Sequence, residues 1–135
     1  MNLKGKGTNA ERELLHMLWR NNWACVRTAG SGSMKYDSPD ILAGNHEKKI
    51  AIECKVTKSN HQYFSKEEIF SLRSFSHLFG AEPFVAVKFN GNGWSFFRIN
   101  TIRETEKNFC VSKNNLEDKP MSFKMTSRDA TTRFN

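Results

Sequence analysis

Hydrophobic and polar residues alternate most regularly between residues 37 and 57. The alternation predicts two short strands, residues 40–43 and 49–56, and the polar residues 44–48 between them predict a turn. Glycine and asparagine at the start of this turn are residues that favour a change of chain direction. The centre of the chain is therefore predicted to be a β-hairpin.

Successive side chains of a strand point to opposite faces, so the second strand is predicted to have one apolar and one polar face. The apolar face consists of Ile50, Ile52, Cys54 and Val56. The other face carries Glu53 and Lys55, and the hairpin brings Asp40 within reach of both. Two carboxylates and a lysine in this arrangement can hold a divalent cation and a phosphate. An ordinary exposed salt bridge explains the same three residues from the hairpin alone.

A first amphipathic helix is predicted before the hairpin. Thr8 and Glu11 have the spacing of a capping box, so the helix is expected to begin at Thr8 and to end near Asn21. Its buried stripe is predicted to consist of Leu14, Leu15, Leu18 and Trp19. Residues 1–7 are expected to precede the helix as a mobile basic arm, and residues 23–28 to follow it as a strand.

A second helix is predicted after the hairpin. Residues 57–64 are polar and irregular, and Ser65 and Glu68 then form a capping box that opens the helix. Gly80 is a typical C-terminal residue and ends it. The apolar residues of this helix occupy more than one stripe: Ile69, Phe70, Leu72, Phe75, Leu78 and Phe79. One face is therefore expected to cover the sheet, and a second face is available to a partner.

Two further strands, residues 83–89 and 94–99, are predicted to form a hairpin across the turn at residues 90–93. The periodicity then fades, and residues 104–135 are expected to be a poorly patterned tail. The predicted order is helix, strand, strand, strand, helix, strand, strand. This order is typical of one α/β domain, residues 1–135, with helices packed on a mixed sheet.

The composition favours a nucleic-acid partner. The chain has 135 residues and a formal net charge of +7, so polyanions are favoured. No apolar run approaches the roughly 18 residues that cross a membrane, and the first residues lack the apolar core of a signal peptide. The cysteines Cys25, Cys54 and Cys110 have neither a zinc spacing nor a disulfide framework, which predicts a reducing cytoplasm. Cys54 is predicted to be a small core residue.

The hairpin carries a recognisable motif. Pro39 and Asp40, followed after twelve intervening residues by Glu53 and Lys55, resemble the PD-(D/E)xK motif of restriction-endonuclease-like nucleases. The predicted order of elements is also similar to the core of that superfamily. More specifically, the chain resembles the archaeal Holliday junction resolvases in five collinear stretches: residues 6–15, 26–31, 39–45, 79–82 and 85–89. Residues 32–38 form a longer insert than the family pattern has, and the tail has no family pattern.

The resemblance implies a Mg²⁺-dependent endonuclease, with Mn²⁺ as an alternative ion, that cuts four-way DNA junctions at two symmetric points. Mapped onto this sequence, Glu11, Asp40 and Glu53 become the acidic metal-binding residues. Lys55 becomes the catalytic lysine, and Ser31 lies in the catalytic loop of the family. The chemistry of phosphodiester hydrolysis agrees with these roles, because a hard cation held by carboxylates activates water and a lysine steadies the phosphate.

The same resemblance implies DNA contacts and a homodimer. Arg12 and Arg27 become phosphate-contacting arginines, and the basic arm with Lys4 and Lys6 is expected to add contacts to DNA. Phe75 and Phe79 of the second helix are predicted to lie in the dimer interface. A symmetric dimer supplies the two active sites that paired cutting requires.

Each assignment has an ordinary structural alternative. Glu11 is also the N3 residue of a capping box, the two arginines are also common surface charges, and Ser31 is also a linker hydroxyl. The two phenylalanines also fit a helix core. For the whole chain, two other functions stay open: a related endonuclease of restriction or nicking type, and a non-catalytic DNA-binding module. Intact Asp40, Glu53 and Lys55 argue against the module.

Overall fold

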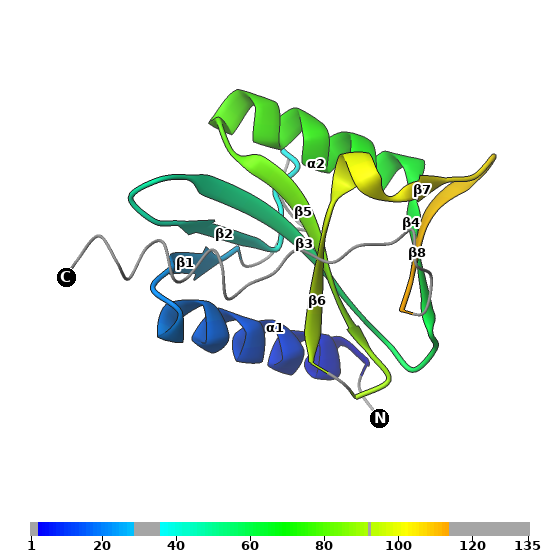
Figure 1. The fold of residues 1–135 in the computed structure, drawn as a ribbon, viewed down its shortest axis with the longest axis horizontal. Coiled ribbons are helices and arrows are strands. Elements are labelled where there is room, and N and C mark those ends of the chain that lie inside the picture. The colour runs from blue at the N-terminus through cyan, green and yellow to red at the C-terminus, as the bar shows by residue number, and fades with distance from the viewer. Residues whose placement is uncertain (1–2, 29–35, 92, 114–135) are drawn as a thin grey trace.

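The computed structural model describes residues 3–28, 36–91 and 93–113, and its elements are drawn in Figure 1. The first half of the fold consists of α1 (Leu3–Arg20), β1 (Ala24–Arg27), β2 (Ile41–Gly44), β3 (Lys49–Thr57) and β4 (His61–Ser65). The second half consists of α2 (Lys66–Phe79), β5 (Glu82–Phe89), β6 (Trp94–Arg98), the short 3₁₀ helix η2 (Ile99–Thr101), β7 (Arg103–Glu104) and β8 (Asn108–Ser112).

Five strands form a central mixed sheet in the order β1-β2-β3-β5-β6. β3 and β5 run parallel, whereas the other neighbours in this sheet are antiparallel. The parallel pair is joined by a crossover that includes β4 and α2, as parallel neighbours require. The predicted α/β class with a mixed sheet and flanking helices is confirmed.

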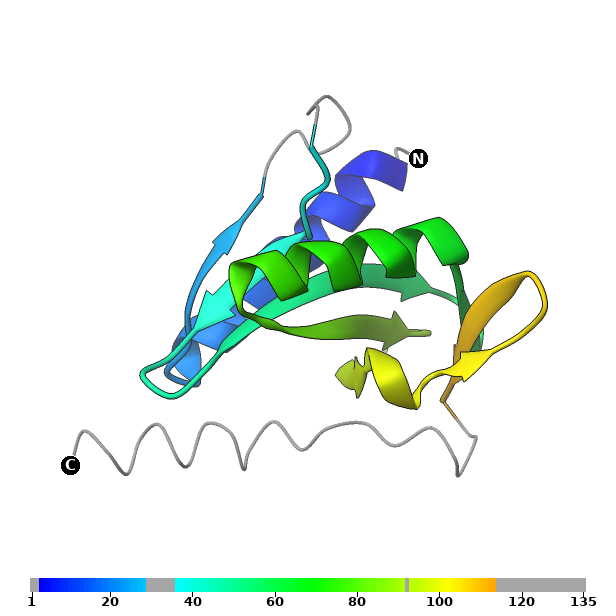
Figure 2. The same ribbon diagram turned by 90° about the horizontal axis from the view of Figure 1, so that it is seen from above.

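The two helices cover opposite faces of the central sheet, α1 on one side and α2 on the other (Figures 1 and 2). Alternate residues of β3 accordingly enter two different cores. Ile50 and Ile52 pack in the cluster that contains Leu14 and Leu18 of α1. Ala51 packs instead in the cluster that contains buried residues of α2. The strand is therefore enclosed on both sides, and its face with Glu53 and Lys55 is not an open, solvated surface.

The helix α1 begins at Leu3, so the prediction that it starts at an N-cap Thr8 is wrong. Residues 3–7, expected as part of a mobile arm, form its first turns. Ala10, Leu14 and Leu18 form a row of buried residues at helical spacing, and the half-buried Gly7 continues this face toward the N-terminus. Glycines in this segment concealed the start, because each disfavours a helix by about 1 kcal/mol relative to alanine.

The predicted buried stripe of α1 is only partly correct. Leu14 and Leu18 are fully buried and Leu15 is partly buried, but the side chain of Trp19 is 52% exposed. Trp23, which follows the helix, is instead completely buried in the α1 cluster. Its backbone N–H donates to the carbonyl of Leu18, so the chain turns back at the end of the helix.

A second, three-stranded sheet in the order β4-β8-β7 was not predicted. Residues 57–64, expected to be irregular, contain most of β4, and the expected tail contains β8. These strands are short, and β4 pairs with residues far along the chain, Tyr63 opposite Cys110 for example. Local alternation cannot reveal such a pairing. Residues 114–135 of the expected tail lie outside the described residues.

Several local predictions are confirmed. The hairpin of β2 and β3 has the expected strands, and Ile41 pairs with Ile52. The helix α2 begins with a complete capping box of Ser65 and Glu68 and ends at Gly80, whose φ of 82° is left-handed. All three cysteines are free and buried.

Within the described part of the chain, no helix has the length and apolar character needed to span a membrane.

The cap of α2 gives a first test. Ser65→Ala removes the hydroxyl that accepts a hydrogen bond from the backbone N–H of Glu68 at 3.0 Å. We expect the free energy of unfolding to fall by about 1 kcal/mol in urea denaturation. Ser74→Ala, at an exposed position of the same helix, is the control and should change it by less than about 0.5 kcal/mol. Equal effects of both substitutions would contradict a role of the cap.

Candidate active site

Asp40 is held firmly at the start of β2. Its backbone N–H donates to the carbonyl of Ile52 at 3.0 Å, and its own carbonyl accepts from the backbone N–H of Thr28 at 2.9 Å. Its carboxylate oxygen Oδ2 accepts a hydrogen bond from the backbone N–H of Cys54 at 2.8 Å. These bonds connect Asp40 to both β1 and β3, so its carboxylate has a defined direction.

Glu53 lies beside Asp40, as the alternation of the hairpin predicted. Burial raises the pKa of Glu53 to about 10, and a hydrogen bond from its carboxyl group to Asp40, together with the charge of Asp40, acts in the same direction. The charge of Lys55 partly opposes this rise in pKa. Without a cation, Glu53 therefore keeps a proton, which lies in its hydrogen bond to Asp40.

Glu11 reaches the same region from α1. It does not cap the helix; its Oε2 accepts a hydrogen bond from Nε of Arg27 on β1 at 2.9 Å. Burial raises the pKa of Glu11, and the charge of Asp40 adds to the rise, although Arg27 lowers it. The arginine predicted to contact phosphate thus neutralises a predicted metal-binding residue in this structure.

Cys54 lies among all three acidic residues. Burial raises the pKa of its thiol well above the usual value, and the charges of Asp40, Glu11 and Glu53 raise it further. This result agrees with the prediction that Cys54 is an unreactive core residue. The same charges show that all three predicted metal-binding residues lie in the neighbourhood of Cys54.

The chemistry of this donor set fits a hard divalent cation. Carboxylate oxygens are the ligands that Mg²⁺ prefers, and a cation would relieve the repulsion within the Asp40–Glu53 pair. Within residues 3–28, 36–91 and 93–113, however, no three acidic, histidine or cysteine side chains are grouped closely enough to surround an ion. Glu11 would have to exchange Arg27 for the ion to complete such a group.

Lys55 forms a contact that the sequence did not predict. Its Nζ lies 2.7 Å from Oε2 of Glu68, in the first turn of α2. Burial lowers the pKa of Lys55, but the hydrogen bond and charge of Glu68 and the charges of Glu53 and Asp40 outweigh it, so the net pKa is raised. Burial raises the pKa of Glu68, but hydrogen bonds from Lys55 and Ser65 lower it overall. The sequence offered one signal for this contact: one face of the second helix was expected to cover the sheet.

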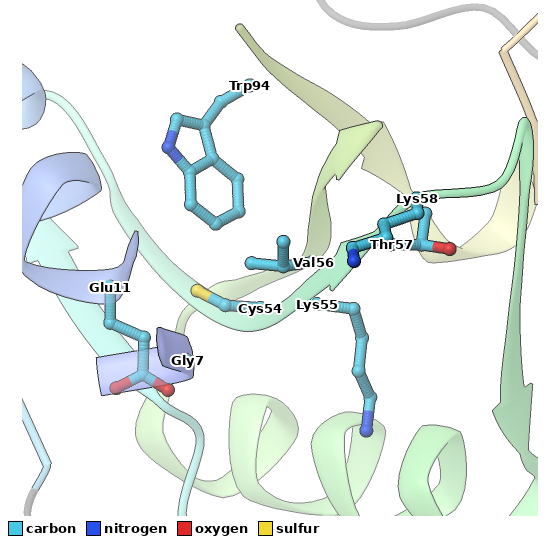
Figure 3. A pocket seen from close by; sticks show the side chains of 8 residues that line it. All are labelled: Gly7, Glu11, Cys54, Lys55, Val56, Thr57, Lys58 and Trp94. Carbon is cyan, nitrogen blue, oxygen red and sulfur yellow. The ribbon is translucent and has the colours of Figure 1, made fainter. Parts of the chain in front are cut away.

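An open cleft of about 500 Å³ adjoins this group (Figure 3). Its lining consists of Gly7, Glu11, Cys54, Lys55, Val56, Thr57, Lys58 and Trp94. Glu11 reaches it from α1, whereas Lys55 extends from β3 toward α2. A second cavity of about 430 Å³ shares Val56, Thr57 and Lys58 and also contacts Lys88. Lys58 and Lys88 are therefore basic residues near the site that the sequence analysis missed.

The remaining predicted residues lie outside this group. Arg12 is exposed on α1, and Ser31 lies outside the described residues, as do the side chains of Lys4 and Lys6. Phe75 and Phe79 stack on each other in α2 with ring centroids 5.3 Å apart. Phe75 packs partly into the core, whereas Phe79 is 45% exposed.

Comparisons with known proteins agree on one family. A model of the family described as archaeal Holliday junction resolvase (Hjc) matches residues 2–127. The chain is 42% identical over 112 residues to a protein of Archaeoglobus fulgidus named crossover junction endodeoxyribonuclease Hjc, covering 83% of this chain and 82% of that one. It is 40% identical over 108 residues to the protein of the same name from Methanocaldococcus jannaschii, covering 80% and 77% of the two chains.

A solved structure shows the same similarity. The crystal structure of Archaeoglobus fulgidus Hjc, described as a Holliday junction resolvase from an archaeal hyperthermophile, matches with a TM-score of 0.82 and 36% sequence identity. The match covers 90% of this chain and 99% of that one, so it extends over the central sheet and both helices.

The shared proton of the acidic pair predicts a pH dependence. In the folded, metal-free protein Glu53 keeps its proton up to about pH 10, whereas the unfolded chain releases it near the ordinary value of 4.5. Between these values the unfolded state binds fewer protons, so this group lowers the free energy of unfolding as the pH rises. We expect Glu53→Gln to flatten the dependence, measured by urea denaturation in EDTA between about pH 5 and pH 9.

Glu106→Gln, in an exposed turn, is the matched control for this measurement. It makes the same chemical change at an exposed carboxyl group, without touching the acidic group, and should leave the slope of the wild-type curve unchanged. If the curves of the wild type and of Glu53→Gln ran parallel, Glu53 would not carry the shared proton.

Proposed function

Because the chain belongs to the archaeal Holliday junction resolvase family, we propose that it is an endonuclease that resolves four-way DNA junctions in recombination and repair by paired, symmetric cuts. The observation that carries this proposal is the convergence of Asp40, Glu53 and Lys55 on one enclosed sheet face beside an open cleft. A module that only bound DNA would gain nothing from two half-buried carboxyl groups, because carboxylate charge repels phosphate.

Mg²⁺ is the cofactor that we propose, with Mn²⁺ as an alternative. Asp40 and Glu53 would hold it, and Glu11 would join them after leaving Arg27. Bound there, a divalent cation supplies a water of lowered pKa and neutralises charge that develops on the phosphate. The support for this proposal is the pairing of two carboxyl groups: burial, together with the hydrogen bond to Asp40 and its charge, raises the pKa of Glu53 to about 10.

The other side chains of the site have distinct tasks. Lys55 keeps its positive charge, so its ammonium is a fixed donor for a non-bridging phosphate oxygen or for the attacking water. Arg27, released from Glu11, presents a planar guanidinium that suits two-pronged contact with phosphate. Lys58 extends the positive charge beyond the cleft next to the end of β3, whereas the charge of Lys88 is paired with Glu13 at 2.9 Å.

A homodimer is the assembly that we propose. Each chain has one acidic group, and two cuts related by symmetry require two of them. The surface of α2 offers an interface, because Phe70 is 71%, Leu78 88% and Phe79 45% exposed. Leu78 and Phe79 are neighbours at the C-terminal end of α2, and adjacent exposed apolar side chains are typical of a protein–protein contact, whereas Phe70 lies about half a turn away from Phe79 around the helix. The cytoplasm is the compartment that we propose, and the three free cysteines are compatible with its reducing conditions.

Cleavage of a synthetic four-way junction tests the proposed activity. Wild-type protein with Mg²⁺ should cut the junction and spare a linear duplex of the same sequence, and EDTA should stop the reaction. Asp40→Asn should lose cleavage because the cation loses a ligand, and Lys55→Ala should lose about 100-fold or more in rate. All variants should still shift the junction in a gel. Cutting of the linear duplex at the same rate would indicate a restriction-type or nicking enzyme.

Sedimentation tests the proposed dimer. Leu78→Ala combined with Phe79→Ala should raise the dissociation constant of the dimer, because both side chains are exposed and contribute little to the core of one chain. Phe75 is a weaker choice because it packs partly into that core. Trp19→Ala, on the opposite helix layer, removes an equally exposed aromatic side chain and should leave the dimer intact. A monomeric wild type at micromolar concentration would overturn the proposal.

A further inference from the structure

We propose that Glu68 is a positioning residue that holds the ammonium group of Lys55 in place for phosphodiester cleavage. The inference rests on the proposed nuclease function and adds a residue that lies outside the PD-(D/E)xK motif. Glu68 comes from the first turn of α2, so it reaches the site from an element on a different layer of the fold from the hairpin (Figure 1).

The two oxygens of the Glu68 carboxylate bind two different partners. Oε1 accepts a hydrogen bond from the backbone N–H of Ser65 at 2.9 Å, and Oε2 lies 2.7 Å from Nζ of Lys55. The backbone N–H of Glu68 in turn donates to Oγ of Ser65 at 3.0 Å. The capping box therefore fixes the carboxylate before any substrate arrives, and the carboxylate fixes the lysine.

Lysine needs such a partner more than most residues. Its long side chain has many rotamers, and an unrestrained lysine would lose this freedom on contact with a phosphate. One N–H of Lys55 is directed to Glu68, which leaves two for the cleft that Lys55 lines. An error of about 1 Å in the position of such a group can cost about 100-fold in rate.

The charges nearby give Glu68 a second effect. The carboxyl groups of Asp40 and Glu53 also attract the Lys55 ammonium. Without Glu68, the ammonium would be drawn toward this pair, where it would compete with a cation for the same oxygens. Glu68 thus keeps the lysine apart from the acidic pair. The Lys55–Glu68 pair also differs from a fully exposed surface salt bridge, because its two side chains are only 36% and 34% exposed.

The substitution Glu68→Gln distinguishes the effect of Glu68 on Lys55 from its part in the capping box of α2. Glutamine is also accepted at this position of a capping box, so the N-terminus of α2 should stay folded while the charge next to Lys55 disappears. Glu67→Gln is the matched control, because it removes the same charge from the same exposed helix turn and Glu67 does not contact Lys55. Single-turnover cleavage of a synthetic four-way junction at saturating protein and Mg²⁺ measures the chemical step.

We expect Glu68→Gln to slow cleavage by about 10- to 100-fold, while the dissociation constant for the junction changes by less than about twofold. Glu67→Gln should behave like the wild type. In the Lys55→Ala background, followed over hours, Glu68→Gln should cause no additional loss of rate, because its effect acts through the lysine. A merely structural role would slow both backgrounds by the same factor.

Three results would overturn the inference. They are a wild-type or faster rate for Glu68→Gln, an equal loss in the Lys55→Ala background, and an equal loss for Glu67→Gln. If the wild-type protein itself left the junction intact, the proposed nuclease function would fail and this inference with it. If the wild type cut normally and Glu68→Gln matched it, only the role of Glu68 would fail.

Discussion

Two carboxyl groups, those of Asp40 and Glu53, lie side by side on a sheet that is covered by helices on both faces. Buried charge without a partner costs several kcal/mol, so this pair imposes a constraint on everything around it. The backbone N–H of Cys54 donates a hydrogen bond to one carboxylate oxygen of Asp40. The proton that Glu53 keeps, in its hydrogen bond to Asp40, removes the repulsion between two negative charges. Neighbouring charges are paired across elements: Glu11 of α1 with Arg27 of β1, and Lys55 of β3 with Glu68 of α2. These two ion pairs connect the candidate site to both helices as well as to the central sheet.

The enclosure of the sheet depends on small residues as much as on large ones. Ala51 of β3 and Ala86 of β5 are fully buried on opposite faces, each beneath one helix. Small side chains at these positions let the helices pack close to the parallel strand pair. The half-buried carboxyl groups of the site therefore lie next to a closely packed interior, where a lower local dielectric strengthens electrostatic interactions.

Local patterns predicted the parts of the molecule that depend on local interactions. The hairpin followed from alternation, and α2 from its capping box and terminal glycine. The meeting of Asp40, Glu53 and Lys55 followed from the same alternation. What could not be predicted connects distant segments: β4 with β8, Glu11 with Arg27, and Lys55 with Glu68. The start of α1 was missed for another reason, because glycine propensity is a weak signal that tertiary packing can override.

The helix α2 is fastened to β3 at both of its ends. Glu68 binds Lys55 near the N-terminus of the helix, and Nζ of Lys49 donates to the carbonyl of Phe79 at the C-terminus, 3.2 Å away. The segment from Glu68 to Phe79 is roughly 16 Å long at about 1.5 Å per residue. In the proposed dimer, the length of this segment would set the distance between the contact surface and each catalytic lysine. The spacing of the two incisions on the DNA would then be set by the length of a helix, and an insertion in α2 would change where the strands are cut.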